Sequence, residues 1–526
     1  MRERLFYNWV SPRLDIWILI FMGICMGFTS GASIALSYMI PDLAIDPTIS
    51  MMCIYSYTAG IAMSFAVFSK LRSYLNIKEM LIGICILLIC FNYIFSKTDS
   101  PVVIVSMSFL IGCVRLLGSM IIVINLMPIL MPQGQRYQLY AVYYPISFAT
   151  SPLSNYTQTI LASKFGWHQS LHIANILLFL ILIIVILLIP YKSRHRRIPM
   201  WKFDWFGFLM MAGWMLSFVY VLTYGKTLAW FHSPRIIIAL IALIFCLSAL
   251  MLQHIILHPK IRLLHFAILK ERNARVGLII IFVFGIFYAM GTPLSAWENI
   301  AFQNNPLELA YVNTYPIYGY VIGALICFLY YRKYNNFKNM LVLAILCYLS
   351  AAYGFYSIID QQTSASMMFT PMVLRAIAII VSFITVGLYL AMSLKEHYRT
   401  IILIFIFVRS FFSSVVFGSL YSNWMYYRPT QLMARLASWT DSSDAIFISN
   451  LRDAHVSGND TLAAYNLFKT QATLAATKEL LGLICIAAVI VLIVILYLPI
   501  YKKLTRHMFT WKNHDGDDDV AETVVV

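Results

Sequence analysis

Three arginines lie near the middle of long apolar runs, where a charge is costly. They are Arg115, Arg375 and Arg409. On insertion scales an arginine at the centre of a spanning helix costs roughly 2.5–3.5 kcal/mol, so each guanidinium needs a polar cavity or a partner. Two roles fit this placement. One is electrostatic contact with a substrate, a proton or a gate, and the other is a packing clamp onto backbone carbonyls. Arg115 is the strongest candidate for the first role.

Carboxylates are scarcer still inside the apolar runs. Glu479 lies at the start of the last run, and Glu298 follows Trp297 near the end of another, in the segment 292–298 (Thr-Pro-Leu-Ser-Ala-Trp-Glu). Pro293 can loosen the helix there, which makes Glu298 the better proton carrier. An interfacial acid beside a tryptophan of the membrane belt is the alternative. We predict that Arg115, Glu298 and the other two arginines carry proton coupling and gating.

Aromatic residues make up 15% of the chain, and many lie inside the apolar runs. Aromatic rings can line a cavity for a flat, apolar or cationic compound, and a few polar groups then orient it. Core or interface packing is the alternative for most of these side chains. The residues predicted to line a substrate cavity are Tyr57, Tyr144, Asn155, Tyr288 and Trp297.

Other chemistry finds little support in the sequence. The pairs His168/His172 and His254/His258 have ligand spacing on a helix, but no acid or thiol completes a metal site. The nine cysteines form no C-x-x-C pair, so they indicate reduced packing residues. Neither a Walker loop nor a Ser-His-Asp arrangement is present. We therefore expect a protein that is not an enzyme and has no metal or cofactor.

The helices that position these residues are predicted to cross a membrane. The chain has 526 residues, 61% of them hydrophobic and 11% charged, with a mean hydropathy of +0.78, which excludes an ordinary water-soluble core. A spanning helix needs roughly 20 apolar residues. We predict about fourteen such runs, and a first long run that is a spanning helix and not a cleaved signal. They lie at about 16–40, 48–69, 79–96, 102–130, 137–162, 168–190, 205–224, 233–257, 276–297, 310–331, 340–359, 367–393, 400–421 and 476–500.

Charge alternates along the loops between these runs. Lysine and arginine cluster before the first run and after each even-numbered run, whereas odd-numbered loops carry acids such as Asp42 and Asp360. Positive loops stay in the cytoplasm, so the net charge of +16 indicates topology and not nucleic-acid binding. We predict two cytoplasmic termini, a six-helix bundle (1–190), two linker helices (191–274), a second bundle (275–500) that includes a large periplasmic loop (422–475), and a cytoplasmic tail (501–526).

Short motifs follow one another in order along the first half of the chain. Residues 114–118 (Val-Arg-Leu-Leu-Gly) are similar to an Arg-x-x-x-Gly motif, and 165–168 (Phe-Gly-Trp-His) to a Gly-Trp-Arg-Trp motif. Residues 203–207 (Phe-Asp-Trp-Phe-Gly) match Phe-Asp-Trp-x-Gly. Together they resemble the fourth, sixth and seventh helices of the fourteen-helix drug:proton antiporters of the major facilitator superfamily, the group of EmrB and QacA.

The second half resembles the same family. Arg375 with Ala376 is similar to the Arg-Gly start of the family's twelfth helix, and Arg409 precedes a similar small-residue face. Residues 471–479 are similar to the family's opening of helix fourteen. Three departures weaken the match: Ser69–Ser73 lacks the acid of the Gly-x-x-x-Asp loop, residues 151–156 replace a glycine-rich motif, and Ala32 stands where an intramembrane aspartate is expected.

This resemblance implies an all-α membrane protein of the major facilitator fold, with fourteen helices arranged as six, two and six. It implies proton-coupled export of drugs or other amphipathic small molecules across the inner membrane, with a periplasmic adaptor resembling EmrA and an outer-membrane channel as partners. A narrower transporter of a metabolite, siderophore or peptide, with weak or different ion coupling, is the alternative. A membrane sensor or scaffold that transports nothing is a third possibility.

Overall fold

The computed structural model describes most of the chain, and the structural statements below concern the described residues. They are 5–28, 36–131, 135–191, 204–256, 269–303, 305–334, 336–360, 363–393, 398–439 and 461–497. Within these ranges the chain folds into helices and contains no β-strand, as the apolar runs predict.

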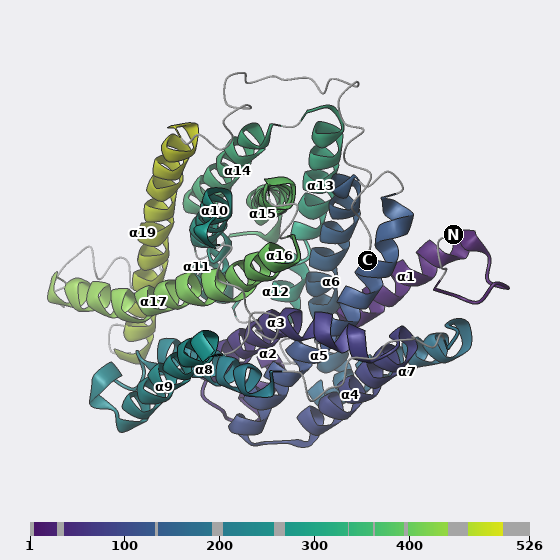
Figure 1. Ribbon diagram of the computed structural model, residues 1–526. Helices are drawn as coiled ribbons and strands as arrows, with labels where there is room; N and C mark the ends of the chain where they lie inside the picture. The colour runs from purple at the N-terminus through teal and green to yellow at the C-terminus, as the bar shows by residue number, and fades with distance from the viewer. Residues whose placement is uncertain are drawn as a thin grey trace.

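The helices fall into an N-terminal half, a linker pair and a C-terminal half (Figure 1). The N-terminal half contains α1 (Pro12–Phe28), α2 (Leu36–Asp42), α3 (Thr48–Tyr74), α4 (Ile77–Lys97), α5 (Pro101–Leu130), α6 (Arg136–Phe165) and α7 (Trp167–Leu188). The linker pair is α8 (Trp205–Tyr224) and α9 (Pro234–Ile256), with the short η3 (Trp230–His232) between them. The C-terminal half contains α10 (Arg272–Tyr288), α11 (Gly291–Ala301), α12 (Pro306–Val312), α13 (Pro316–Lys333), α14 (Phe337–Ile358), α15 (Ala365–Ser393), α16 (Tyr398–Ile406), the π-helical turn η5 (Phe407–Phe412), α17 (Ser413–Trp439) and α19 (Thr461–Tyr497).

Eleven helical segments in the described part of the chain are long and apolar enough to cross a membrane. The helices α1, α3 and α6 coincide with three further predicted spans. The described length of α1 is 17 residues, whereas α3 and α6 have 27 and 30 residues and a more polar composition. The total of fourteen spans stays a prediction, and residues 29–35, which include Ala32, lie outside the described ranges.

Three apolar clusters form the core. One lies within the N-terminal half, a second within the C-terminal half, and a third joins α3, α5 and α8 to η5 and α17. One face of α6 belongs to the second cluster, through Leu139, Tyr140 and Tyr144. The two halves therefore meet along α6, which packs against α13 and α15.

The described parts of the segment 422–475, which is predicted to be a large periplasmic loop, are helical. Residues 422–439 continue α17, and residues 461–475 form the first turns of α19. Polar composition suggested a loop, but these helical extensions hold each other. The Arg428 guanidinium donates to both carboxylate oxygens of Glu479, at 2.6 and 3.1 Å, and the Trp424 indole N–H donates to the Ala476 carbonyl. Bidentate arginine–carboxylate pairs are among the stronger polar contacts in proteins.

Hydrogen bonds between helix ends join loops that are predicted to lie on the same side of the membrane. On the face formed by odd-numbered loops, the Trp167 indole N–H donates to Asp42 Oδ2 at 2.8 Å. On the same face the Trp297 indole N–H donates to the Asp360 carbonyl at 2.9 Å. Each pair joins the ends of helices that a strict up-and-down path brings to one side.

On the opposite face, the contacts join the ends of helices that meet even-numbered loops. Lys78 Nζ donates to the Ile186 carbonyl at 2.8 Å, and Arg136 Nη1 donates to the Ala391 carbonyl at 2.7 Å. Both cations come from even-numbered loops, where basic residues are predicted to gather. The alternation of charge thus coincides with two physical faces, while the assignment of the basic face to the cytoplasm stays a prediction.

The turn after α8 ties the linker pair to the C-terminal half. Lys226 Nζ donates to the Ser422 carbonyl at 3.3 Å and to the Ser422 hydroxyl, and it lies 5.8 Å from the centre of the Tyr426 ring. Burial lowers the pKa of the Lys226 ammonium, an effect that the charge of Asp46 partly opposes. The linker pair therefore contacts α3 through its core and α17 through this turn.

Helices α3 and α5 approach closely enough to exclude any side chain at Gly60. A Cβ atom there would lie 2.1 Å from the Phe109 carbonyl oxygen and 2.8 Å from the Cys113 nitrogen. We expect Gly60→Ala to lower the free energy of unfolding by about 1–3 kcal/mol, because overpacking forces the backbones apart. Thermal melting of the purified protein measures this loss.

Gly83 in α4 provides the matched control, since a Cβ atom added there would meet no neighbouring helix within 4 Å. Gly83→Ala should leave the melting temperature unchanged or raise it slightly, because alanine is the better helix former by about 1 kcal/mol. If the two variants melt at the same temperature, the close approach of α3 and α5 is not a source of stability.

Candidate functional site

Arg115 of α5 forms hydrogen bonds with the end of α1. Its Nε donates to the Met26 carbonyl at 3.2 Å, its Nη2 donates to the Gly27 carbonyl at 2.8 Å, and its Nη1 donates to the Tyr57 hydroxyl. These carbonyls belong to the last described turn of α1. The arginine therefore acts as a clamp onto backbone carbonyls, and each of its three nitrogens has an acceptor.

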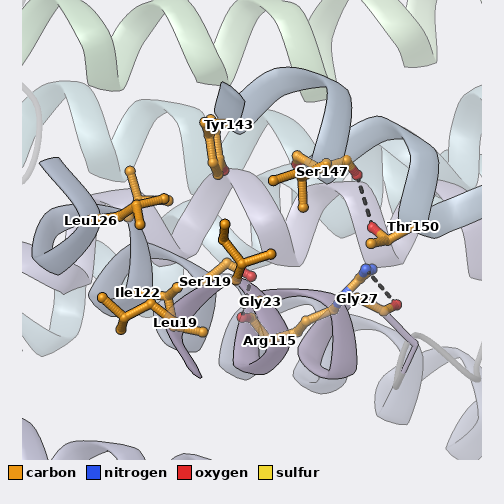
Figure 2. Close-up of a pocket in the computed structure, with 13 residues that line it drawn as sticks. Leu19, Gly23, Gly27, Arg115, Ser119, Ile122, Leu126, Tyr143, Ser147 and Thr150 are labelled. Atoms are coloured by element: carbon orange, nitrogen blue, oxygen red, sulfur yellow. Dashed lines mark hydrogen bonds between the residues drawn. The ribbon is translucent and has the colours of Figure 1, made fainter. Parts of the chain in front are cut away.

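A small cavity of about 60 Å³ lies beside this clamp, between α1, α5 and α6 (Figure 2). Pockets for drug-sized ligands occupy about 300–1,000 Å³, so this cavity has room only for a few waters or a small ion. Hydroxyl groups from α5 and α6 face it. Its lining is Leu19, Ile20, Gly23, Gly27, Arg115, Ser119, Ile122, Val123, Leu126, Tyr143, Ile146, Ser147 and Thr150.

Arg375 of α15 occupies a comparable position in the C-terminal half. Its Nη2 donates to the carbonyl of Tyr288, the last residue of α10, at 3.2 Å. The guanidinium packs against Gly291, the first residue of α11, where a Cβ would lie 2.8 Å from Nη2. Arg375 also interacts electrostatically with Glu298, whose side chain is buried at 6% exposure. Its Nε is buried without a partner in the described structure.

The two clamps repeat each other in the order of helices. Arg115 comes from the fourth predicted span of its half and holds the last described turn of α1. Arg375 comes from the fourth predicted span of the other half and holds the end of α10, where the chain breaks before α11. The two arginines therefore occupy corresponding positions in the order of helices of the two halves.

Arg409 lies in the π-helical turn η5, among aromatic rings from both halves. Its Cζ atom lies 5.5 Å from the ring centre of Tyr144, 5.8 Å from Phe148, 4.8 Å from Phe383 and 5.7 Å from Phe405. All four distances are within the range of cation–π attraction. Tyr144 and Phe148 belong to α6 of the N-terminal half, so the guanidinium lies at the contact between the halves.

These rings continue along the contact between the halves. Tyr140, Tyr144 and Phe148 recur every four residues on one face of α6, and Phe148 lies 5.5 Å from both Tyr320 and Phe383, measured between ring centres. We call these five residues the aromatic seam. Tyr140, Phe148 and their partners are not among the residues predicted to line a cavity, although the i, i+4, i+8 spacing on α6 is a usable signal.

The residues predicted to line a cavity are dispersed. Tyr57 holds Arg115, Tyr144 belongs to the aromatic seam, and the Tyr288 ring lies 5.7 Å from Phe383 of the seam. Asn155 is half-buried on α6 and lies outside the lining of the small cavity. Trp297 is completely buried in the core of the C-terminal half. Only part of the predicted set therefore meets at the contact between the halves.

Comparison with known proteins supports the fold. No protein-family model and no curated protein sequence matches the chain. A solved bacterial homologue of the human drug peptide transporters PepT1 and PepT2 is 16% identical, with a TM-score of 0.59, and the match covers 93% of this chain and 98% of that one. Tetrameric PepTSo2 is 13% identical, with a TM-score of 0.59 and coverages of 93% and 98%. The nucleoside transporter NupG is 12% identical, with a TM-score of 0.52 and coverages of 93% and 100%. The chain therefore has the all-helical fold of these membrane transporters.

Proposed function

We propose that this chain is a secondary transporter that moves one class of small organic solute by alternating access between its two halves. The observation that carries this proposal is the aromatic seam, in which Arg409 and rings from both halves meet. A charged side chain is costly at such a contact, and charged residues that are kept within membrane spans usually mark a substrate or ion pathway. Similar structures include a nucleoside transporter and proton-dependent oligopeptide transporters, which favours a metabolite or peptide as cargo.

We propose Glu298 as the proton carrier and Arg375 as the charge that responds to it. Glu298 is a buried carboxyl group in the helix that follows the break at Tyr288, and Arg375 holds that break. Protonation of Glu298 would remove the attraction between the two charges and allow α10 and α11 to shift relative to α15. Arg115 would hold the end of α1 in the other half.

Proton-coupled drug export is the second candidate, favoured by the order of the motifs along the chain. One motif has a structural explanation that does not depend on cargo. The Asp204 carboxylate accepts the Gly207 N–H at 2.8 Å and caps α8, and a Cβ at Gly207 would lie 2.4 Å from that carboxylate. Because this motif is explained by helix capping, it does not discriminate between drugs and metabolites. The inner-membrane location and the adaptor partner also rest on the resemblance alone and stay predictions.

Transport by purified protein in liposomes tests the proposal. We expect an imposed pH gradient to drive accumulation of members of one solute class when dipeptides, nucleosides and small carboxylates are screened, whereas protein-free liposomes accumulate none. Gradient-dependent movement of a cationic dye, with no response to the metabolites, would favour drug export. If neither a gradient nor an excess of solute on one side produces any movement or exchange, the chain is not a transporter of these compounds.

A further inference from the structure

The three intramembrane arginines differ in how their donors are satisfied. Each side-chain nitrogen of Arg115 has an acceptor, and Arg375 donates to the Tyr288 carbonyl beside the charge of Glu298. Arg409 has neither arrangement. Its Nη1 is buried without a partner in the described chain, and its Nε and Nη2 reach only the Ser410 hydroxyl, each at 3.4 Å. That distance is at the long limit for a hydrogen bond.

Aromatic rings contact the flat faces of the Arg409 guanidinium, whereas the N–H groups along its edge lack good acceptors. Aromatic rings interact with the flat face of a guanidinium and accept none of its in-plane N–H bonds. In-plane donors are best matched by an oxyanion, which can accept two parallel hydrogen bonds from one arginine. No carboxylate within the described ranges forms an ion pair with Arg409. An anionic ligand would therefore supply what this side chain lacks.

We infer that Arg409 and the aromatic seam bind an organic anion, with the anionic group on the guanidinium edge and a flat apolar body against the rings. Phe148 of α6 and Phe383 of α15 already lie 5.5 Å apart between ring centres, so the flat body would lie against one side of this group of rings and not between them. A cation is the poorer ligand, because it would compete with Arg409 for the same rings. The local π-helical turn agrees with this assignment, since such turns frequently occur at functional sites. The role of this anion as cargo rests on the proposed transport function, but its binding does not.

Equilibrium binding to the full-length purified protein tests the site without requiring transport. Three probes share one ring system: 2-naphthoate is anionic, 2-naphthamide is neutral and 2-naphthylmethylammonium is cationic. We expect saturable calorimetric binding of 2-naphthoate, at least tenfold tighter than either other probe. Arg409→Gln should weaken 2-naphthoate at least tenfold, and Arg409→Lys should restore part of the loss because it keeps the charge.

Two further variants keep the test decisive. Arg428→Gln changes an arginine outside the seam and should leave 2-naphthoate affinity within twofold of the original. Phe148→Leu keeps Arg409 and should weaken 2-naphthoate severalfold, which tests the rings if the Arg409 variants fail to fold. Absence of 2-naphthoate binding, equal binding by Arg409→Gln, or tighter binding of the cation would each overturn the inference. Binding without any transport in liposomes would instead reject the proposed function and retain the site.

Discussion

Arg115→Met is expected to abolish transport and to destabilise the protein. Methionine fills a similar volume but leaves the Met26 and Gly27 carbonyls and the Tyr57 hydroxyl without their donor. A buried polar group left unsatisfied costs about 1–3 kcal/mol, so the combined loss should be about 3 kcal/mol or more. Thermal melting of the purified variant and solute uptake per folded molecule in liposomes measure the two effects separately.

Arg115→Lys separates charge from geometry. Lysine retains the positive charge but lacks the planar fork that reaches two adjacent carbonyls, so we expect intermediate stability. Normal uptake by a folded Arg115→Met variant, assayed well below its melting temperature, would assign Arg115 to packing alone. If Arg115→Met loses uptake and Arg115→Lys retains it, the positive charge itself is needed in the transport cycle.

Glu298→Gln is expected to uncouple transport from the pH gradient while preserving solute exchange. Glutamine is nearly isosteric with the protonated acid, so the variant should resemble a carrier that cannot release its proton. Gradient-driven accumulation should fall at least tenfold, and exchange of labelled for unlabelled solute should remain. Both rates can be measured in the same liposome preparation, and full gradient-driven accumulation by the variant would exclude Glu298 as the proton carrier.

Arg375 provides the complementary half of this test. Arg375→Met removes a charge that interacts with Glu298 and leaves the Tyr288 carbonyl without its donor, so we expect the free energy of unfolding to fall by about 1–3 kcal/mol. Adding Glu298→Gln to Arg375→Met should recover much of that stability, since no uncompensated carboxylate then remains. A double variant whose stability loss equals the sum of the single losses would show that the two charges do not interact.

The sequence located the charged residues correctly but could not identify their partners. Apolar runs were sufficient to predict helices at α5 and α15, whereas the interruption between α10 and α11, just before Pro293, lies inside a run that was predicted as one span. The partners of Arg115 are backbone carbonyls, which every residue carries, so no residue type marks them. Only the packing of α5 against α1 selects Met26 and Gly27.

Neither the aromatic seam nor the helical extensions of α17 and α19 could be predicted from the sequence, and the reasons are related. Phe383 and Tyr320 look like any other apolar residues of a spanning helix, and only the contact between the two halves brings them to Phe148. The extensions of α17 and α19 are stabilised by Arg428 and Glu479, which are 51 residues apart. Local composition cannot reveal a partner at that separation.

The attachment of the linker pair limits how the molecule can change shape. Helix α8 packs in one apolar cluster with α3, while Lys226 in the following turn holds Ser422 of α17. If the halves rotate apart on that face, either the contact at Lys226 breaks or the linker pair slides across α3. In the proposed transport cycle the linker pair would therefore restrain the amplitude of the motion between the halves. The apolar surface that α9 exposes would then lie in lipid that has to rearrange around it.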